Sequence, residues 1–118
     1  MSSLRIQRVR ELLKRTVGEV IRREISVEEA GLITVNDVGM SSDLHSATVF
    51  VGIVGSAAQK KRGEAILQGA RKRIQTLAGQ AMVLKYTPVL RFIVSDSIER
   101  GNRVLEIIEE IEKSSPET

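Results

Sequence analysis

The sequence predicts an α+β domain in which helices cover one face of a three-stranded sheet, with the element order α-β-β-α-β-α. Apolar residues recur every three or four positions in three stretches, as in amphipathic helices. Three other short stretches are rich in β-branched residues, as in strands. A chain of 118 residues without cysteine can bury a core that needs no disulfide. We therefore expect one domain over residues 1–113 and a short flexible tail over 114–118.

The elements follow from local signals along the chain. A first helix is expected over residues 4–25, and strands over 32–38 and 47–54 are joined by turn residues that include Ser41 and Asp43. A long helix then runs from about residue 57 towards Pro88, before which the backbone becomes extended, and a third strand covers 89–94. A last helix follows Ser97. The long helix allows the third strand to return beside the first.

The long helix is the stretch that bears most directly on function. One side carries a periodic apolar stripe made of Ile66, Ala70, Ile74, Leu77, Ala81 and Leu84. The opposite side is expected to present Lys61, Gln68, Lys72, Gln75 and Gly79, with Arg71 and Arg73 flanking the stripe. Gly79 has a second interpretation, as a site of close helix packing. The helix thus packs on one face and offers cations and amides on the other.

The charge of the chain is unevenly distributed. The net charge is +3, but residues 57–95 hold eight basic residues and one acidic residue, whereas residues 26–56 hold four acidic residues and no basic one. A local excess of cations on one helix attracts polyanions. A solvated helix face that only confers solubility is the other interpretation, and charge alone does not separate the two.

Several patterns that resemble functional motifs are better explained by structure. Gly52-Ile53-Val54-Gly55 lies at the end of a predicted strand and has no adjacent cation, so we interpret it as strand and turn. His45 near Asp43 has no nucleophile or third ligand beside it, which indicates a surface pair. Phe50 and Phe92 are expected in the core, and Tyr86 is the aromatic residue that could stack on a base. The sequence predicts neither a catalytic nor a metal site, and no cofactor.

Taken in order, the landmarks of the chain resemble the ribosome-binding factor A family. They are Arg8-Val9, Val38-x-x-Ser41-x-Asp43, Ala47-x-Val49, Leu77-x-Gly79-x-Ala81-Met82-x-Leu84, and Pro88-x-Leu90-x-Phe92-x-x-x-Asp96-x-Ser97 with Gly101 beyond. No single landmark is diagnostic, but together they match over nearly the whole chain.

The resemblance implies a type II KH-like fold in which an Ala-x-Gly kink replaces the usual Gly-x-x-Gly turn. By position the kink falls on Ala70-Arg71-Lys72, where Lys72 stands in place of the glycine. The unbroken apolar stripe also permits a nearly continuous helix, and Gly69 could supply some of the missing flexibility. Whether the helix bends is left open by the sequence.

The resemblance also implies a function. Members act late in maturation of the small (30S) ribosomal subunit and bind its immature 16S rRNA. We expect RNA contacts from a basic helix–kink–helix surface with the residues Lys60, Lys61, Arg62, Ala70, Arg71, Lys72, Arg73 and Lys85. A secondary surface comprises Arg5, Arg8, Arg10 and Tyr86.

We also form expectations about the location, the oligomeric state and the partners of the protein. We expect a cytoplasmic monomer that is not an enzyme, with the small subunit and its 16S rRNA as partners and with neither a membrane nor a small-molecule substrate. The N-terminal residues lack the apolar core of a signal peptide. The alternative is a small α+β interaction or regulatory domain that binds a protein through its open sheet face and no RNA.

Overall fold

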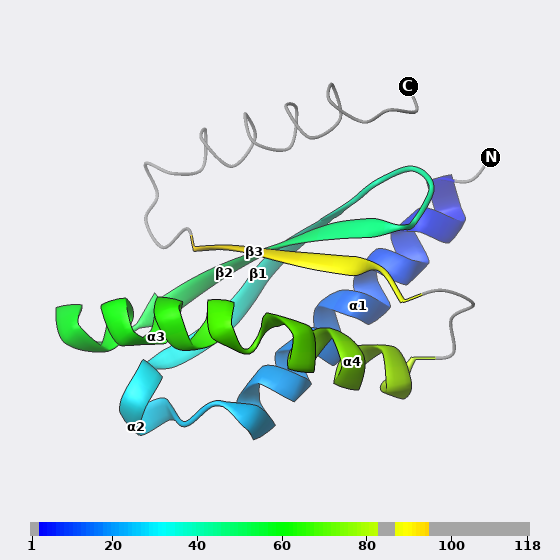
Figure 1. The fold of residues 1–118 in the computed structure, drawn as a ribbon. Coiled ribbons are helices and arrows are strands. Elements are labelled where there is room, and N and C mark those ends of the chain that lie inside the picture. The colour runs from blue at the N-terminus through cyan, green and yellow to red at the C-terminus, as the bar shows by residue number, and fades with distance from the viewer. Residues whose placement is uncertain (1–2, 83–86, 95–118) are drawn as a thin grey trace.

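The computed structural model describes residues 3–82 and 87–94, and in this part of the chain the helices lie on one face of a three-stranded sheet (Figure 1). The α+β prediction is therefore confirmed, while the expected last helix and tail lie outside the described residues. The elements are α1 (Ser3–Glu24), α2 (Val27–Ala30), β1 (Leu32–Met40), β2 (Ser46–Val54), α3 (Ala57–Gly69), α4 (Arg71–Ala81) and β3 (Val89–Val94).

The strand order differs from the expected one. The sheet has the order β1-β2-β3, in which β1 and β2 form an antiparallel hairpin and β3 pairs with β2 in parallel. The prediction that the third strand returns beside the first is wrong. The reason lies in β2, which is largely apolar and is buried at every position from Ala47 to Ile53, as a strand at the centre of a sheet is.

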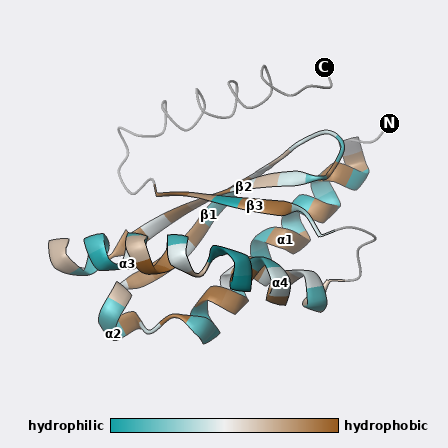
Figure 2. Cartoon of the chain, in the orientation of Figure 1, coloured by the Kyte–Doolittle hydropathy of each residue, from teal (hydrophilic) through white to brown (hydrophobic). Residues whose placement is uncertain are grey.

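The core lies between the sheet and the helices, and hydrophobic residues gather on the sides of the helices that face it (Figure 2). Each of the larger elements contributes at least one side chain that is fully buried. These residues include Leu13, Val17 and Val20 of α1, Val38 of β1, Val49 and Val51 of β2, Leu67 of α3, Ile74 of α4 and Leu90 of β3. Burial of this kind contributes roughly 1.5–3 kcal/mol for each large side chain.

The expected long helix is interrupted at Ala70, so α3 and α4 are separate helices. The two have different partners, because α3 packs on α2 and α4 packs on α1. At the start of α3, the Ser56 hydroxyl accepts a hydrogen bond from the Gln59 backbone, and the Gln59 side chain accepts one from the Ser56 backbone in return. The Gln59 amide also donates to Glu28 O at 3.2 Å. This end of α3 is therefore fixed to α2.

The outer face of the sheet is polar only in part. Thr34, Asn36 and Arg91 are exposed there, whereas Phe50, which points to the same side as Arg91, is 1% exposed. Phe92, on the helix side, is also buried. Neither phenylalanine is available for base stacking, as the sequence predicted.

The contact between α2 and α3 gives a test of the fold. A Cβ atom at Gly63 would lie 2.4 Å from Ala30 O, a backbone atom that cannot rotate away. We expect Gly63→Ala to destabilise the domain by about 1–3 kcal/mol, as overpacking does. Gly69→Ala is the matched control, because no atom lies within 4 Å of its Cβ position, and alanine has the higher helix propensity. Urea unfolding of both variants measures the difference, and equal stabilities would contradict the packing argument.

Candidate nucleic-acid interface

The junction between α3 and α4 places backbone and cations on an open surface. Ala70 has φ −92° and ψ 5°, outside the helical region, and its N–H donates to Ile66 O at 2.9 Å. Gly69 just before it is exposed, with empty space where a side chain would be. The bend implied at Ala70-Arg71-Lys72 is therefore present, although Lys72 replaces the glycine.

The three basic residues after the break have different environments. Arg71 is half-buried, and its Nη1 donates to Leu90 O at 3.2 Å and to Gln75 Oε1 at 3.4 Å. Arg73 is exposed, and its Nε donates to Glu24 Oε1 at 2.6 Å. Lys72 is exposed and makes no hydrogen bond or ion pair with residues 3–82 or 87–94. Of the triplet, Lys72 is the cation that is available to a ligand.

The basic residues at the start of α3 form a separate group. Lys60, Lys61 and Arg62 are exposed, and Arg62 Nε donates to Glu29 O at 3.1 Å, which attaches α3 to α2. At a rise of 1.5 Å per residue, this group lies about 15 Å along the helices from Lys72. The two groups therefore do not form one cluster.

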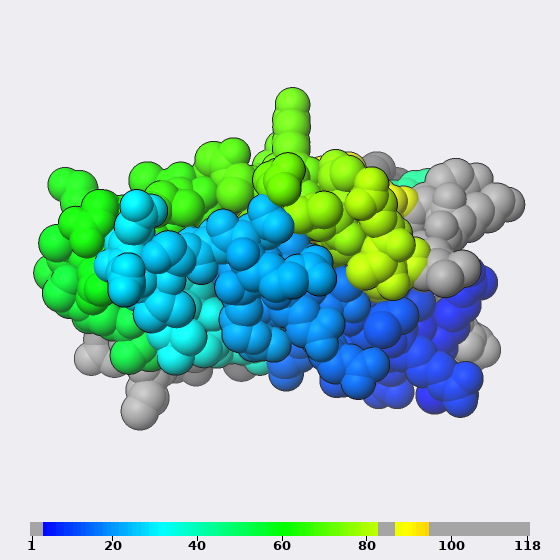
Figure 3. Space-filling view, turned by 90° about the horizontal axis from the view of Figure 1, so that it is seen from below, coloured from blue at the N-terminus to red at the C-terminus, as the bar shows by residue number. Residues whose placement is uncertain are grey.

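The remaining predicted residues are more dispersed. Lys85 and Tyr86 lie outside the described residues. Arg5 and Arg8 are exposed in the first half of α1, and Arg10 is half-buried there. The structure does not bring these arginines into the α3–α4 surface, since α1 approaches α4 further along its length, where Glu24 meets Arg73. Figure 3 shows α1 and α4 side by side on the face opposite the sheet.

A contact that the sequence did not predict holds β3 to these helices. Leu90 N donates to Gln75 Oε1 at 2.8 Å, and Gln68 Nε2 donates to Phe92 O at 2.9 Å. With Arg71, these amides bind the free edge of β3, whose backbone groups would otherwise lack strand partners. The expectation that Gln75 faces outward is therefore wrong, since it is half-buried, whereas Gln68 is exposed although its amide donates to β3. The i, i+3, i+7 spacing of Gln68, Arg71 and Gln75 places them on one side of the helix, but it does not distinguish a strand edge from solvent.

Gly79 also has a packing role. A Cβ atom at this position would lie 2.5 Å from the Thr87 hydroxyl, so the glycine allows the segment before β3 to approach α4. This agrees with the interpretation of Gly79 as a site of close packing, rather than as part of the outward face.

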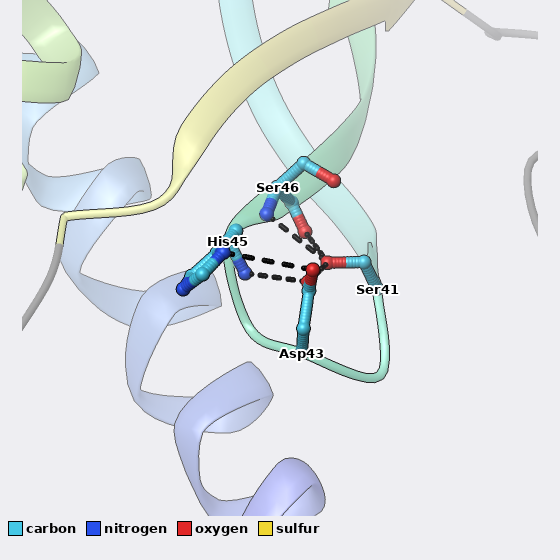
Figure 4. Close-up of polar contacts among 4 residues, drawn as sticks. All are labelled: Ser41, Asp43, His45 and Ser46. Atoms are coloured by element: carbon cyan, nitrogen blue, oxygen red, sulfur yellow. Dashed lines mark hydrogen bonds and ion pairs between the residues drawn. The ribbon is translucent and has the colours of Figure 1, made fainter. Parts of the chain in front are cut away.

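The hairpin between β1 and β2 carries a local hydrogen-bond network (Figure 4). The Ser41 hydroxyl donates to Asp43 Oδ1 at 2.6 Å, and the backbone N–H of His45 donates to the same atom at 3.0 Å. Ser46 N donates to Ser41 Oγ at 3.1 Å, and His45 Nδ1 lies 3.6 Å from Asp43 Oδ2. The bonds from Ser41 and His45 lower the pKa of Asp43. The network closes the turn between β1 and β2.

Two kinds of site are absent from the described residues. Within 3–82 and 87–94, no three metal-binding side chains come together. No helix in these ranges is long and apolar enough to cross a membrane. The basic surface at the α3–α4 junction remains the candidate site.

Comparison with known proteins identifies the family of the chain. A family model described as ribosome-binding factor A matches residues 5–108. A ribosome-binding factor A from Halothermothrix orenii is 34% identical over 113 residues, which cover 96% of this chain and 93% of the relative. The chain belongs to the ribosome-binding factor A family. The KH-like fold implied by the resemblance is consistent with this membership.

Solved structures of the family share the fold. The crystal structure of ribosome-binding factor A from Thermus thermophilus matches with a TM-score of 0.65 at 22% identity, over 75% of this chain and 93% of the other. A homology model of the Thermus thermophilus factor, as fitted into the cryo-EM map of a 30S complex, matches with a TM-score of 0.59 at 23% identity, over 70% of this chain and 86% of the other. The chain therefore shares its overall fold with these structures.

Because Arg71 and Lys72 have different environments, we expect their substitution to change the stability of the domain by different amounts. We expect Arg71→Ala to lower the free energy of unfolding by about 1–2 kcal/mol, because Leu90 O loses a charged donor. Lys72→Ala is the control and should change it by less than about 0.5 kcal/mol. Chemical denaturation measures both values. Equal effects would show that the Arg71 contact does not hold β3.

The hydrogen-bond network of the hairpin predicts that the stability of the turn between β1 and β2 depends on pH. The folded pKa of Asp43 is lowered, so the network stabilises the turn at neutral pH and is lost as the pH falls through that value. We expect the His45 and Ser46 amides to lose protection against hydrogen exchange as the pH falls, when the measured rates are compared with intrinsic rates at the same pH. Asp43→Ala should make this protection independent of acid pH. If the wild-type protection does not change with pH, the assignment is contradicted.

Proposed function

We propose that this chain is an assembly factor that binds immature 16S rRNA of the small ribosomal subunit late in maturation, through the α3–α4 surface, without catalysing a reaction. The observation that carries the proposal is the exposed junction at Ala70, where Lys72 is unpaired within the described residues and Gly69 leaves the backbone open. Family membership supports it, as do the coordinates of the Thermus thermophilus relative, which were fitted into a map of its 30S complex.

The chemistry of the junction suits a phosphate backbone. No side chain caps the first turn of α4, and a helix N-terminus attracts anions. Lys72 adds a full positive charge in the same turn, and the Lys61 side chain extends the basic surface along α3. The buried phenylalanines leave the described sheet without a stacking platform, which favours recognition of phosphates and shape over recognition of bases.

In this proposal the other predicted cations contribute less directly to RNA binding than Lys72. Arg71 and Arg73 keep their contacts with Leu90 and Glu24 and add positive potential near the junction. Lys60 and Arg62 lie at the far end of the surface, while Arg5, Arg8 and Arg10 remain a secondary surface on α1. We further propose that the factor acts in the cytoplasm as a monomer.

Lys72 gives the direct test of this surface. We expect Lys72→Glu to weaken binding to immature small subunits about tenfold or more at low salt, because it replaces a phosphate contact by repulsion. Glu64→Lys is the matched control, since this exposed residue of α3 makes no hydrogen bond or ion pair with the described residues and the change adds positive charge. Co-sedimentation with subunits at several salt concentrations measures both. Wild-type protein that fails to bind subunits or 16S rRNA at low salt would overturn the proposed function.

A further inference from the structure

A groove lies between α1 and β1, and it shares no residue with the α3–α4 surface. It has a volume of about 330 Å³ and is lined by Glu11, Lys14, Arg15, Gly18, Arg22, Thr34 and Val35. Strand β1 is the edge of the sheet opposite β3, because the strand order is β1-β2-β3. The groove is thus separated from the contacts that hold α4 to β3.

The cations of this groove are unpaired within the described part of the chain. Lys14, Arg15 and Arg22 form no hydrogen bond or ion pair with residues 3–82 or 87–94. In this they differ from Arg62, Arg71 and Arg73, each of which donates to another residue of the chain. The groove cations can therefore neutralise a ligand without first breaking an internal contact of this kind.

The shape of the groove allows a close approach. A Cβ atom at Gly18 would lie 3.9 Å from both Arg22 Nη1 and Val35 Cγ2, so the guanidinium of Arg22 lies over the glycine, next to β1. Lys14, Gly18 and Arg22 are spaced by four residues and follow one line along α1. No aromatic side chain lines the groove among the described residues, so it offers cations and no surface for stacking.

We propose that the α1–β1 groove binds a second segment of RNA phosphate backbone, at the same time as the α3–α4 surface holds the first. This inference rests on the proposed function, since it assumes that rRNA is the ligand. Arg15 and Arg22 bind phosphate oxygens with their planar guanidinium groups, and Lys14 acts as a point charge. A line of cations beside a narrow groove matches the repeating charge of a phosphodiester chain.

The experiment compares the salt dependence of binding to 16S rRNA for two double variants. We expect Arg15→Gln with Arg22→Gln to reduce the slope of log K against log salt concentration by about 0.7–0.9 for each phosphate that is no longer neutralised. Arg23→Gln with Arg91→Gln is the control, because it removes the same charge from exposed residues outside the groove. The control should leave the slope nearly unchanged. Combining the groove variant with Lys72→Gln should lower the slope by the sum of the separate effects.

The outcomes separate this inference from the proposed function. If wild-type protein binds and Lys72→Gln weakens binding, but the groove variant behaves as its control does, the groove inference is wrong and the proposed function stands. If the groove variant loses affinity for intact subunits but not for protein-free 16S rRNA, the groove binds a protein, which also overturns the inference. If wild-type protein binds no rRNA, both fall together.

Substitution of Glu11 should raise the affinity for RNA, whereas substitution of the groove cations should lower it. It is the one carboxylate among the described residues that line the groove, so it repels a bound phosphate. We expect Glu11→Gln to raise the affinity for 16S rRNA about two- to fivefold at low salt, because it removes this repulsion. The control is Glu19→Gln, a carboxylate of the same helix that does not line the groove and should have a smaller effect. Equal gains would show that only the net charge of the chain matters and would contradict a phosphate site in the groove.

Discussion

Strands β2 and β3 run parallel, so the chain between them has to cross the helix face of the sheet before β3 can begin. Helices α3 and α4 form this crossover, and each has its own partner, because α3 packs on α2 and α4 packs on α1. One straight helix would not serve both contacts, and the break at Ala70 allows each half to follow its own direction. The break also directs Arg71 to the free edge of β3 and leaves Lys72 exposed to solvent. The candidate site is thus a consequence of the crossover.

A cation in a basic segment is not always available to bind a ligand. Residues 57–95 hold the largest excess of basic residues, yet Arg62, Arg71 and Arg73 donate to Glu29, Leu90 and Glu24. These contacts attach α3 and α4 to the rest of the domain. Helix α1 has the smaller excess, but its groove cations make no such contacts within the described residues. The two basic surfaces are therefore closer in their capacity to bind phosphate than their charges suggest.

The parts of the structure that sequence predicted well depend on local signals. The periodicity of α1, the β-branched strands and the turn at Ser41 and Asp43 each involve neighbours within one element. The contacts that were missed join residues far apart in the chain, such as Arg73 with Glu24 and Gln75 with Leu90. A glutamine on a helix has the same pattern whether it faces water or a strand edge. The strand order could have been predicted, because the largely apolar run from Ala47 to Ile53 is typical of a central strand.

Position 72 shows how the bend and the charge are related. The family motif has glycine there, yet the helix breaks at Ala70 with lysine in that place, so the bend does not depend on a flexible residue at 72. The competing contacts of α3 and α4 are sufficient to explain it, with Gly69 weakening the helix just before the break. Because the Lys72 side chain makes no hydrogen bond or ion pair with the described residues, its charge is available to a ligand. It adds a positive charge to a helix N-terminus that already favours anions, at the point where the backbone beside Gly69 is open.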